Sequence, residues 1–482
     1  MKILFVASEA VPFIKTGGLA DVVGSLPKEL KQQGLDVRVI LPKYKWIKAD
    51  TEITPLLDFT VKVGWRKQYC GIEEATYGGI RFYFVDNLQY FDRDGIYGFD
   101  DEAERYTFFC KAVLASLPRI KFCPDVIHLH DWQTAIISLL KQVHHGEDPF
   151  YQQIKMVFTI HNLQYQGIFP KAVLPELLDL SWDYYTPERI EFFDNVNFLK
   201  AGLVYSQRIT TVSQTYAEEI QHPFFGEQLD GLLQSRRDQL VGIVNGIDYH
   251  EYDPETDPYI YKGYGWNSLR YKVENKLRLQ RDLNLPVDRK IPIIGVVSRL
   301  ANQKGLDLIT RVLKDILDLS VQLVVLGTGD PGYEEMLRQA ATRYPDRMSA
   351  NLLFDNSLAH QIYAGADLFL MPSRFEPCGL SQLIAMRYGC LPIVRETGGL
   401  RDTVIPYNEM TREGYGFTFT NYNAHDMLCT IDRALSFYRD KPAWTRMRKT
   451  AMQLDFSWRS SATRYRELYE ELVKDDAVRE DT

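Results

Sequence analysis

The chain has few cysteines, no excess of positive charge and no long apolar run. Its 482 residues include only six cysteines, which are widely scattered and form no Cys-x-x-Cys pair. This spacing predicts neither a zinc site nor a disulfide framework, and a reducing compartment is the simpler interpretation. The net charge is −8. A negative chain is not a whole-surface binder of nucleic acid, so any basic site must be local.

A membrane segment is also missing from the sequence. The longest uncharged stretch, residues 156–170, is interrupted by His, Asn and Gln, and it is shorter than the roughly 20 apolar residues that a spanning helix needs. The apolar run at the N-terminus is too short for a secretory signal and is followed at once by Glu9. We therefore expect a cytoplasmic protein, or a plastid protein if a transit peptide has been removed.

The composition is that of an ordinary globular protein, with 45% hydrophobic and 25% charged residues. At roughly 150 residues per domain, the length predicts two or three domains. Short runs rich in Val and Ile alternate with longer segments of helical period, which predicts an α/β fold with parallel sheets and helices on both faces. We expect strands at residues 3–7, 36–41, 80–85, 125–130, 155–160, 209–212, 291–298, 321–327, 366–371 and 391–394.

Two strand-helix series are separated by a plausible domain boundary. Asn245-Gly246-Ile247-Asp248 and the polar stretch 253–258, which contains two prolines, lie between them. We place the hinge near residue 245, with one domain over residues 1–244 and the second over 245–456. Two doubly wound domains that face each other would present the carboxyl ends of their strands to a central cleft.

A candidate anion site follows the first expected strand. Lys15-Thr16-Gly17-Gly18 lies where that strand passes into a helix. Paired glycines let the backbone approach a phosphate, free N–H groups favour negative charge, and Lys15 adds a cation. A tight turn with a surface lysine is the alternative.

The second half places charged residues after two of its strands. Arg299 and Lys304 lie five residues apart after the first, where they suit a diphosphate; a solvated helix start is the alternative. Glu376, between Phe375 and Pro377, follows another strand and could bind sugar hydroxyls or stabilise positive charge, unless it is an idle surface residue. Cys378 is interpreted as a packed thiol.

Polar side chains also end two strands of the first half. His128, His130 and Asp131 follow one strand and His161-Asn162 follows the next. No metal-binding spacing such as His-Glu-x-x-His is present, so hydrogen bonding to a polyol is favoured over a metal site. Buried histidines with satisfied hydrogen bonds are the alternative.

Residues 327–332 match the pattern Gly-x-Gly-x-x-Gly directly after a strand. The match is weak evidence for a dinucleotide site, because no acidic ribose partner is clearly placed about 20 residues on and Pro331 disturbs the usual entry into the helix. We interpret this segment as a turn or a loop beside a phosphate.

Taken together, these motifs resemble the bacterial glycogen and plant starch synthases. The resemblance is carried by their order and spacing over nearly the whole chain: Lys15-Thr16-Gly17-Gly18-Leu19, His130-Asp131-Trp132, His161-Asn162, Ser298-Arg299-Leu300, Gln303-Lys304-Gly305, residues 374–380 and Thr397-Gly398-Gly399-Leu400. It implies two Rossmann-like domains in the arrangement called GT-B, with a final helix, within residues 457–482, that crosses back to the first domain. It also implies transfer of glucose from ADP-glucose, with retention, to the non-reducing 4-hydroxyl of an α-1,4-glucan such as glycogen, starch or a maltooligosaccharide.

The resemblance also implies site residues. The catalytic residues would be Lys15, Asp131, His161, Arg299, Lys304 and Glu376. The donor contacts would be Lys15, Gly17, Gly18, Asn162, Asn245, Arg299, Lys304, Phe354, Cys378, Gly379, Leu380, Ser381 and Gly398, with Phe354 offered to the adenine. No metal and no cofactor are expected, since ADP-glucose is a co-substrate, and we favour attack on the face from which the diphosphate leaves. Family members often have Thr where this chain has Asn302 and Ser381.

Three rival functions stay open at the level of sequence. A nicotinamide oxidoreductase is suggested by two Rossmann-like halves, and a glucan-binding protein without activity by the 13% aromatic content. A related transferase with another acceptor, as in sucrose- or trehalose-type synthases, is the nearest alternative. The choice between ADP-glucose and UDP-glucose, the physiological product and the oligomeric state are not settled by the sequence.

Overall fold

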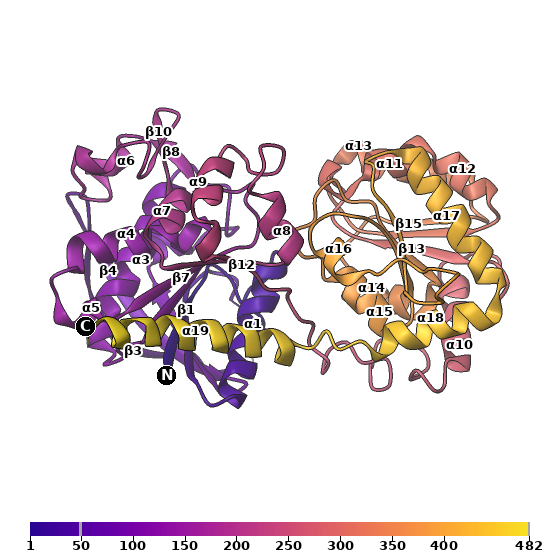
Figure 1. Cartoon of the computed structure of the whole chain (residues 1–482), viewed down its shortest axis with the longest axis horizontal. Helices are drawn as coiled ribbons and strands as arrows, with labels where there is room; N and C mark the ends of the chain where they lie inside the picture. Colours follow the sequence, from indigo (N-terminus) through magenta and orange to yellow (C-terminus); the bar gives the residue numbers. More distant parts are fainter. Residues whose placement is uncertain (48–50, 481–482) are drawn as a thin grey trace. The chain divides into compact units, whose positions relative to one another are not determined.

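The computed structural model describes residues 1–47 and 51–480, which form two compact units (Figure 1). Unit 1 comprises Met1–Val212, Ala217–Gly246 and Trp458–Thr482, and unit 2 comprises Ser213–Tyr216 and Ile247–Ser457. The chain therefore enters unit 2 after Gly246 and returns to unit 1 at Trp458.

Unit 1 is built on a nine-stranded sheet with the order β12-β11-β7-β6-β1-β2-β5-β4-β3. Its strands are β1 (Lys2–Val6), β2 (Asp36–Pro42), β3 (Thr54–Val63), β4 (Arg66–Tyr77), β5 (Ile80–Asp86), β6 (Val126–His130), β7 (Lys155–Ile160), β11 (Arg208–Thr211) and β12 (Leu240–Gly242). The seven strands from β12 to β5 are parallel, and β4 and β3 extend the sheet as an antiparallel hairpin. The parallel part is doubly wound, because the strand order reverses between β1 and β6.

Helices cover the sheet of unit 1. They are α1 (Gly18–Gln32), α2 (Leu88–Phe91), α3 (Glu102–Arg119), α4 (Trp132–His145), α5 (Pro149–Gln152), α6 (Val173–Glu176), α7 (Phe198–Tyr205), α9 (Asp230–Ser235) and α19 (Trp458–Glu480), with α8 (Gln214–Glu219) in the loop between β11 and β12. Short 3₁₀ turns lie at Trp182–Tyr184 and Arg237–Gln239, and a small separate sheet contains β8 (Ile168–Pro170), β9 (Glu191–Phe192) and β10 (Asn195–Asn197).

The C-terminal helix α19 packs against α1 and the sheet of unit 1 (Figure 1). Its buried apolar residues recur at helical spacing and form one face: Trp458, Ala462, Tyr465, Leu468, Tyr469 and Leu472. This face explains why the last segment of the chain belongs to the same core as the first strand.

Unit 2 has a six-stranded parallel sheet with the order β15-β14-β13-β16-β17-β18. Its strands are β13 (Ile293–Val297), β14 (Gln322–Leu326), β15 (Met348–Asn351), β16 (Leu368–Met371), β17 (Leu391–Arg395) and β18 (Phe417–Phe419). Counted within the unit, this order is 3-2-1-4-5-6, the Rossmann order, and it reverses between β13 and β16.

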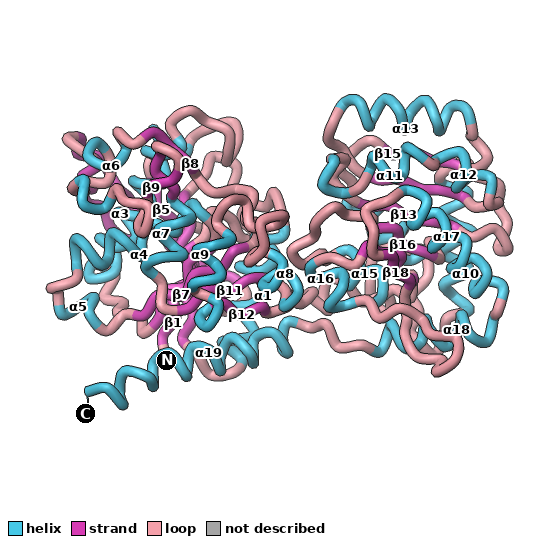
Figure 2. Tube along the Cα trace, turned by 45° about the horizontal axis from the view of Figure 1, so that its top comes forward, coloured by secondary structure: helices cyan, strands magenta, loops and turns pink. Residues whose placement is uncertain are grey.

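Helices lie on both sides of this sheet (Figure 2). They are α10 (Arg270–Asp282), α11 (Leu306–Arg311), α12 (Leu313–Asp318), α13 (Pro331–Arg343), α14 (Asn356–Gly365), α15 (Ser381–Arg387), α16 (Gly398–Thr403), α17 (Ala424–Arg439) and α18 (Lys441–Gln453), with a 3₁₀ turn at Asn302–Lys304. The strands between them are almost fully buried, as expected of a parallel sheet covered on both faces.

The predicted fold class is confirmed: each unit contains a doubly wound, Rossmann-like sheet. Among the residues that the structure describes, no helix is long and apolar enough to cross a membrane.

Candidate active site

The expected site residues of unit 1 all follow carboxyl ends of parallel strands. Lys15, Gly17 and Gly18 come after β1, Asp131 after β6, His161 and Asn162 after β7, and Asn245 after β12. Because these strands run parallel in one sheet, the residues share one edge. The strand order reverses between β1 and β6, which is where doubly wound sheets bind ligands.

The loop that carries Lys15 is anchored by a buried carboxylate. Glu9 is only 3% exposed. Its oxygens accept hydrogen bonds from the Thr16 backbone N–H at 2.5 Å and from the Thr16 hydroxyl at 3.0 Å. Burial raises the pKa of Glu9, and the bonds from Thr16 oppose that rise. Lys15 itself is half exposed, with Nζ 2.7 Å from Asp21 Oδ1.

Asp131 holds the turn that carries the next two site residues. Its Oδ1 accepts the backbone N–H of His161 at 2.8 Å, and the backbone N–H of Asn162 bonds to the same carboxylate. Burial raises the pKa of Asp131 to about 7, although these two bonds lower it. The residue has φ 57°, a left-handed conformation that costs a non-glycine residue on the order of 1–3 kcal/mol.

Three histidines line this edge as neutral side chains. His161 Nε2 lies 2.9 Å from His130 Nδ1, and the rings of His128 and His130 lie 4.2 Å apart. Burial lowers the pKa of His161 to about 3 and lowers those of His128 and His130 well below their usual value. A neutral imidazole can donate one hydrogen bond and accept another, which suits a hydroxyl-bearing ligand.

Two buried polar atoms at the same edge lack partners among the described residues. They are Oδ1 of Asn245 and Nε2 of His130. Buried polar groups are normally hydrogen-bonded, so orphaned atoms at a strand edge mark positions where a ligand can supply the missing partner.

In unit 2, the structure joins two of the predicted site residues directly. Lys304 Nζ lies 2.6 Å from Glu376 Oε2, and the Ser373 hydroxyl donates to the same oxygen at 2.9 Å. Lys304 follows β13 and Glu376 follows β16, the two strands between which the sheet order reverses. The carboxylate is therefore held in one orientation at the position where such a sheet binds ligands.

Arg299 lies in the loop after β13 that also carries Lys304. Its side chain is exposed and makes one long contact, 3.5 Å, to Gln303 Oε1. Gln303 in turn connects the two loops, because its carbonyl accepts the Arg374 N–H at 2.8 Å. An exposed guanidinium in the same loop as a fixed Lys–Glu pair can bind an anionic ligand.

The segment from Cys378 to Ser381 forms the turn into α15. Cys378 is buried, Gly379 has φ +72° and Ser381 begins the helix, where its side chain bonds to Tyr363. Leu380 precedes the helix and is partly buried. The packing of Cys378 agrees with its interpretation as a structural thiol.

Gly398 lies against the backbone of the Glu376 loop. It has φ +45°, and a Cβ there would lie 2.0 Å from the Glu376 carbonyl oxygen. The Gly399 N–H donates to that same oxygen at 3.1 Å. Only glycine permits this approach, so Gly398 positions the loop that carries Glu376.

The Gly-x-Gly-x-x-Gly segment is a packing turn in the structure. A Cβ at Gly327 would lie 1.9 Å from the Ser298 carbonyl oxygen. The Leu300 N–H donates to the Thr328 carbonyl at 2.9 Å. This segment therefore supports the loop that carries Arg299. Phe354 lies in the loop after β15 at the same sheet edge and is 88% exposed.

Glu9 and Ser373 support the site but were not predicted from the sequence. Both are polar residues that follow apolar strands and are almost fully buried, at 3% and 1% exposure. The position of Glu9 directly after an apolar strand was the only signal in the sequence. Across residues 1–47 and 51–480, no group of three or more His, Cys, Asp and Glu side chains could hold a metal ion.

Two protein-family models match this chain, one mainly in unit 1 and one in unit 2. A model described as the starch synthase catalytic domain matches residues 2–235, and a model of glycosyl transferases group 1 matches residues 280–452. The chain is 56% identical over 475 residues to a glycogen synthase of Desulforamulus reducens, with 98% of this chain and 99% of that protein covered. The chain belongs to the glycogen and starch synthase family. A second member, from Anoxybacillus flavithermus, is 54% identical, with 99% of each chain covered.

Solved structures agree with this membership. The catalytic domain of starch synthase IV from Arabidopsis thaliana, bound to ADP and acarbose, has a TM-score of 0.92 and 34% identity, with 98% of this chain and 99% of that chain covered. Sucrose-phosphate synthase from Thermosynechococcus elongatus shares the fold, with a TM-score of 0.62 and 18% identity over 98% of this chain and 99% of that one. The family is one of glycosyltransferases, so the hydride-transfer alternative is set aside.

Proposed function

We propose that this chain transfers glucose from ADP-glucose to the non-reducing 4-hydroxyl of an α-1,4-glucan, with retention of configuration. The observation that carries the proposal is the Lys304–Glu376 ion pair at the strand-order reversal of unit 2, with Arg299 in the same loop as Lys304. The full-length similarity to glycogen synthases and the ADP-bound starch synthase relative support the same assignment.

The chemistry of glucosyl transfer needs charge of both signs. The diphosphate gains negative charge as it leaves, and the sugar passes through a state with positive charge at the anomeric carbon. In the proposal, Arg299 and Lys304 bind the diphosphate, and Glu376 binds the glucose and stabilises its positive charge. Lys304 holds Glu376 in place. The ion pair therefore orients both the cation that binds the diphosphate and the carboxylate that stabilises the sugar.

Unit 1 supplies hydrogen-bonding groups in this proposal. The neutral His161 ring, Asn162 and the unpartnered Oδ1 of Asn245 are suited to sugar hydroxyls. Lys15 and the glycines beside it would add a contact to the diphosphate. Asp131 would act mainly by fixing the His161–Asn162 turn, since its carboxylate accepts both backbone N–H groups.

The proposal includes no metal ion and no cofactor, because cationic side chains supply the charge that faces the diphosphate. The acceptor hydroxyl attacks on the face from which the diphosphate leaves. The six free cysteines of the structure are consistent with a reducing compartment such as the cytoplasm.

The test is a comparison of sugar-nucleotide donors. Initial rates are measured with ADP-glucose and with UDP-glucose on a maltooligosaccharide primer, and the anomeric configuration of the product is read by NMR. We expect chain extension by α-1,4-linked glucose, faster with ADP-glucose. Preference for UDP-glucose would overturn the donor assignment, and transfer to fructose or glucose phosphate instead of the primer would overturn the acceptor.

A further inference from the structure

Unit 2 contains a cavity at the edge of its sheet opposite the candidate active site. The cavity has a volume of about 780 Å³. Residues just before β13, β14 and β16 contribute to its wall, whereas Arg299 and Glu376 follow the other ends of β13 and β16. A cavity of this size can hold a ligand as large as a sugar phosphate or a nucleotide.

The inner wall of the cavity carries two buried lysines from one face of α10. Lys272 and Lys276 are 2% and 3% exposed. Lys276 Nζ lies 2.7 Å from Asp367 Oδ2, so its charge is compensated. Among the residues that the structure describes, Lys272 Nζ donates to the carbonyls of Tyr363 and Ala364, both at 2.9 Å, and to no carboxylate. Burial lowers the pKa of Lys272 to about 7; Arg448 and Lys276 also lower it, whereas Cys390 and Asp367 oppose the fall.

Arg448 on α18 adds a guanidinium with unmet hydrogen bonds. Its Nε and Nη2 atoms are buried and have no partner among the described residues. Trp444, one turn earlier on the same helix, also has a buried Nε1 without a partner. Buried donors without acceptors cost free energy, which an anionic ligand in the cavity would recover.

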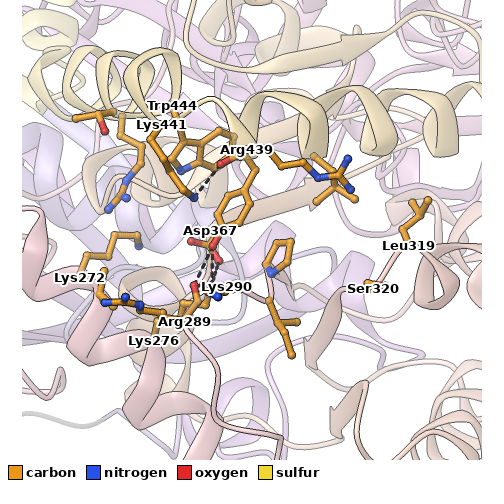
Figure 3. Close-up of a pocket in the computed structure, with 18 residues that line it drawn as sticks. Lys272, Lys276, Arg289, Lys290, Leu319, Ser320, Asp367, Arg439, Lys441 and Trp444 are labelled. Carbon is orange, nitrogen blue, oxygen red and sulfur yellow. Dashed lines mark hydrogen bonds and ion pairs between the residues drawn. The ribbon is translucent and has the colours of Figure 1, made fainter.

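The outer wall carries four more cations, all exposed: Arg289, Lys290, Arg439 and Lys441. In the described part of the chain, none of these four forms an ion pair with a carboxylate. Figure 3 shows Asp367 in the middle of the group, with Lys276 and Arg289 below it and Lys441 and Trp444 above it.

The cavity therefore carries an excess of positive charge. Seven basic residues and one acidic residue line it. The acidic residue, Asp367, already has partners in the protein: its Oδ2 pairs with Lys276 and also accepts the Ile293 N–H at 3.0 Å. Clustered like charges repel one another, and the repulsion is strongest where the groups are withdrawn from water.

We propose that this cavity binds a small organic anion with at least two phosphate groups, of the size of a sugar bisphosphate. Arginine binds phosphate oxygens in a bidentate manner, and Arg448 on the inner wall and Arg439 at the rim are placed to bind two such groups. The buried Trp444 N–H, which has no partner among the described residues, adds a hydrogen-bond donor for a phosphate oxygen or a hydroxyl. This site is built by unit 2 alone and does not depend on the proposed function.

The first experiment is titration calorimetry of the full chain with fructose 1,6-bisphosphate, fructose, inorganic phosphate and citrate. We expect the bisphosphate to bind more than tenfold tighter than inorganic phosphate, with no heat from fructose. No binding of the bisphosphate would overturn the proposal. Tighter binding of citrate would overturn the choice of phosphate over carboxylate.

Variants then locate the site. We expect Lys290→Gln with Arg439→Gln, and separately Arg448→Gln, to raise the dissociation constant of the bisphosphate at least tenfold. Because Lys290 and Arg439 are exposed, the double variant should keep its unfolding temperature even if Arg448→Gln does not. Arg343→Gln, an exposed position on α13 outside the cavity, is the matched control and should change affinity less than twofold.

Arg299→Ala separates this cavity from the candidate active site. We expect bisphosphate affinity to stay within twofold of the parent in that variant. Loss of binding in Arg299→Ala, with binding retained in the Lys290/Arg439 variant, would place the anion at the sheet's other edge and refute the proposal.

Discussion

Lys304 and Glu376 form an ion pair, with Nζ and Oε2 2.6 Å apart, although they come from different loops of unit 2. Their side chains are 19% and 8% exposed. The pair has two consequences. Each residue orients the other, and removal of either leaves a largely buried charge without its partner.

Substitution of the two cations after β13 should therefore have different effects on stability. We expect both Arg299→Ala and Lys304→Ala to lower kcat on the order of 10²–10³-fold, because both contacts strengthen as the diphosphate leaves. Only Lys304→Ala should also lower the free energy of unfolding, by about 3 kcal/mol, since it leaves Glu376 buried and unpaired. Initial rates and urea unfolding measure the two quantities.

Lys314→Ala is the control for these variants, because Lys314 forms an exposed ion pair with Asp318 on α12. It should change neither rate nor stability appreciably. Near-parental turnover in Arg299→Ala and Lys304→Ala would remove both residues from the diphosphate site.

Glu376→Gln tests the role of the carboxylate with the sugar. The variant keeps the shape and some hydrogen bonding but loses the charge, so kcat should fall sharply while ADP affinity changes little. Calorimetry with ADP and rates of ADP release separate these effects. Ser373→Ala, which removes one hydrogen bond to Glu376, should reduce kcat far less.

Two outcomes contradict this assignment. Unimpaired turnover in Glu376→Gln removes the residue from the active site. A collapse of ADP affinity, in a variant that unfolds like the parent protein, moves Glu376 to the nucleotide.

The central strands were predictable because parallel strands buried on both faces are continuous apolar runs. Each of the ten expected strands overlaps an observed one, and the expected start of β7 at Lys155 and end at Ile160 are reproduced. The strands β8, β9, β10, β12, β15 and β18 and the hairpin β3–β4 were missed. The hairpin is the longest of these segments. It lies at the sheet edge, where exposed and buried residues alternate irregularly and the apolar signal is weak.

The site was predictable only as separate pieces. Residues after strands were identified because strand ends are local features of the sequence. The Lys304–Glu376 pair joins positions 72 residues apart, and Glu9 binds a turn through its fully buried side chain. Such contacts depend on tertiary packing, which spacing in the sequence does not encode.

Asp131 should make stability depend on pH. Burial raises its pKa from 3.8 to about 7, so between these values the folded chain holds a proton that the unfolded chain has released. The resulting stabilisation is complete below pH 3.8 and is lost as the pH rises to about 7. Asp131→Asn does not titrate, so the variant should gain stability relative to the parent, by about 3 kcal/mol, between about pH 5 and pH 8.

Urea unfolding of both proteins across this range is the measurement. A pH-independent difference between parent and variant would show that Asp131 titrates normally in the folded chain.

Tyr469 on α19 donates or accepts a buried hydrogen bond with His128 Nδ1 at 2.7 Å. Tyr469→Phe removes the hydroxyl and leaves the His128 nitrogen without this partner, so we expect a loss of about 1–3 kcal/mol in the free energy of unfolding. Tyr165→Phe is the control, because Tyr165 is 50% exposed. An equal free energy of unfolding in Tyr469→Phe and Tyr165→Phe would mean that this hydrogen bond does not stabilise the packing of α19 on the sheet.

Glu9 should influence catalysis through Lys15. Its carboxylate accepts the N–H and the hydroxyl of Thr16, and a glutamine would present an NH₂ group to one of these donors. Loss of a charge-assisted bond costs about 1.5–3 kcal/mol and frees the loop that carries Lys15. We therefore expect Glu9→Gln to lower kcat/KM for the donor about 10- to 100-fold, while Thr16→Ser, which keeps the hydroxyl, stays close to the parent.

The decisive measurement is a double-mutant cycle of Glu9→Gln and Lys15→Ala. If Glu9 acts by positioning Lys15, the kcat/KM of the double variant should be close to that of Lys15→Ala alone, because the Lys15 side chain that Glu9 positions is already absent. If the two fold-changes in kcat/KM multiply instead, Glu9 contributes by a route that does not pass through Lys15. Unfolding curves of all four proteins distinguish either result from a general loss of stability, since a variant whose midpoint is unchanged reports on the site alone.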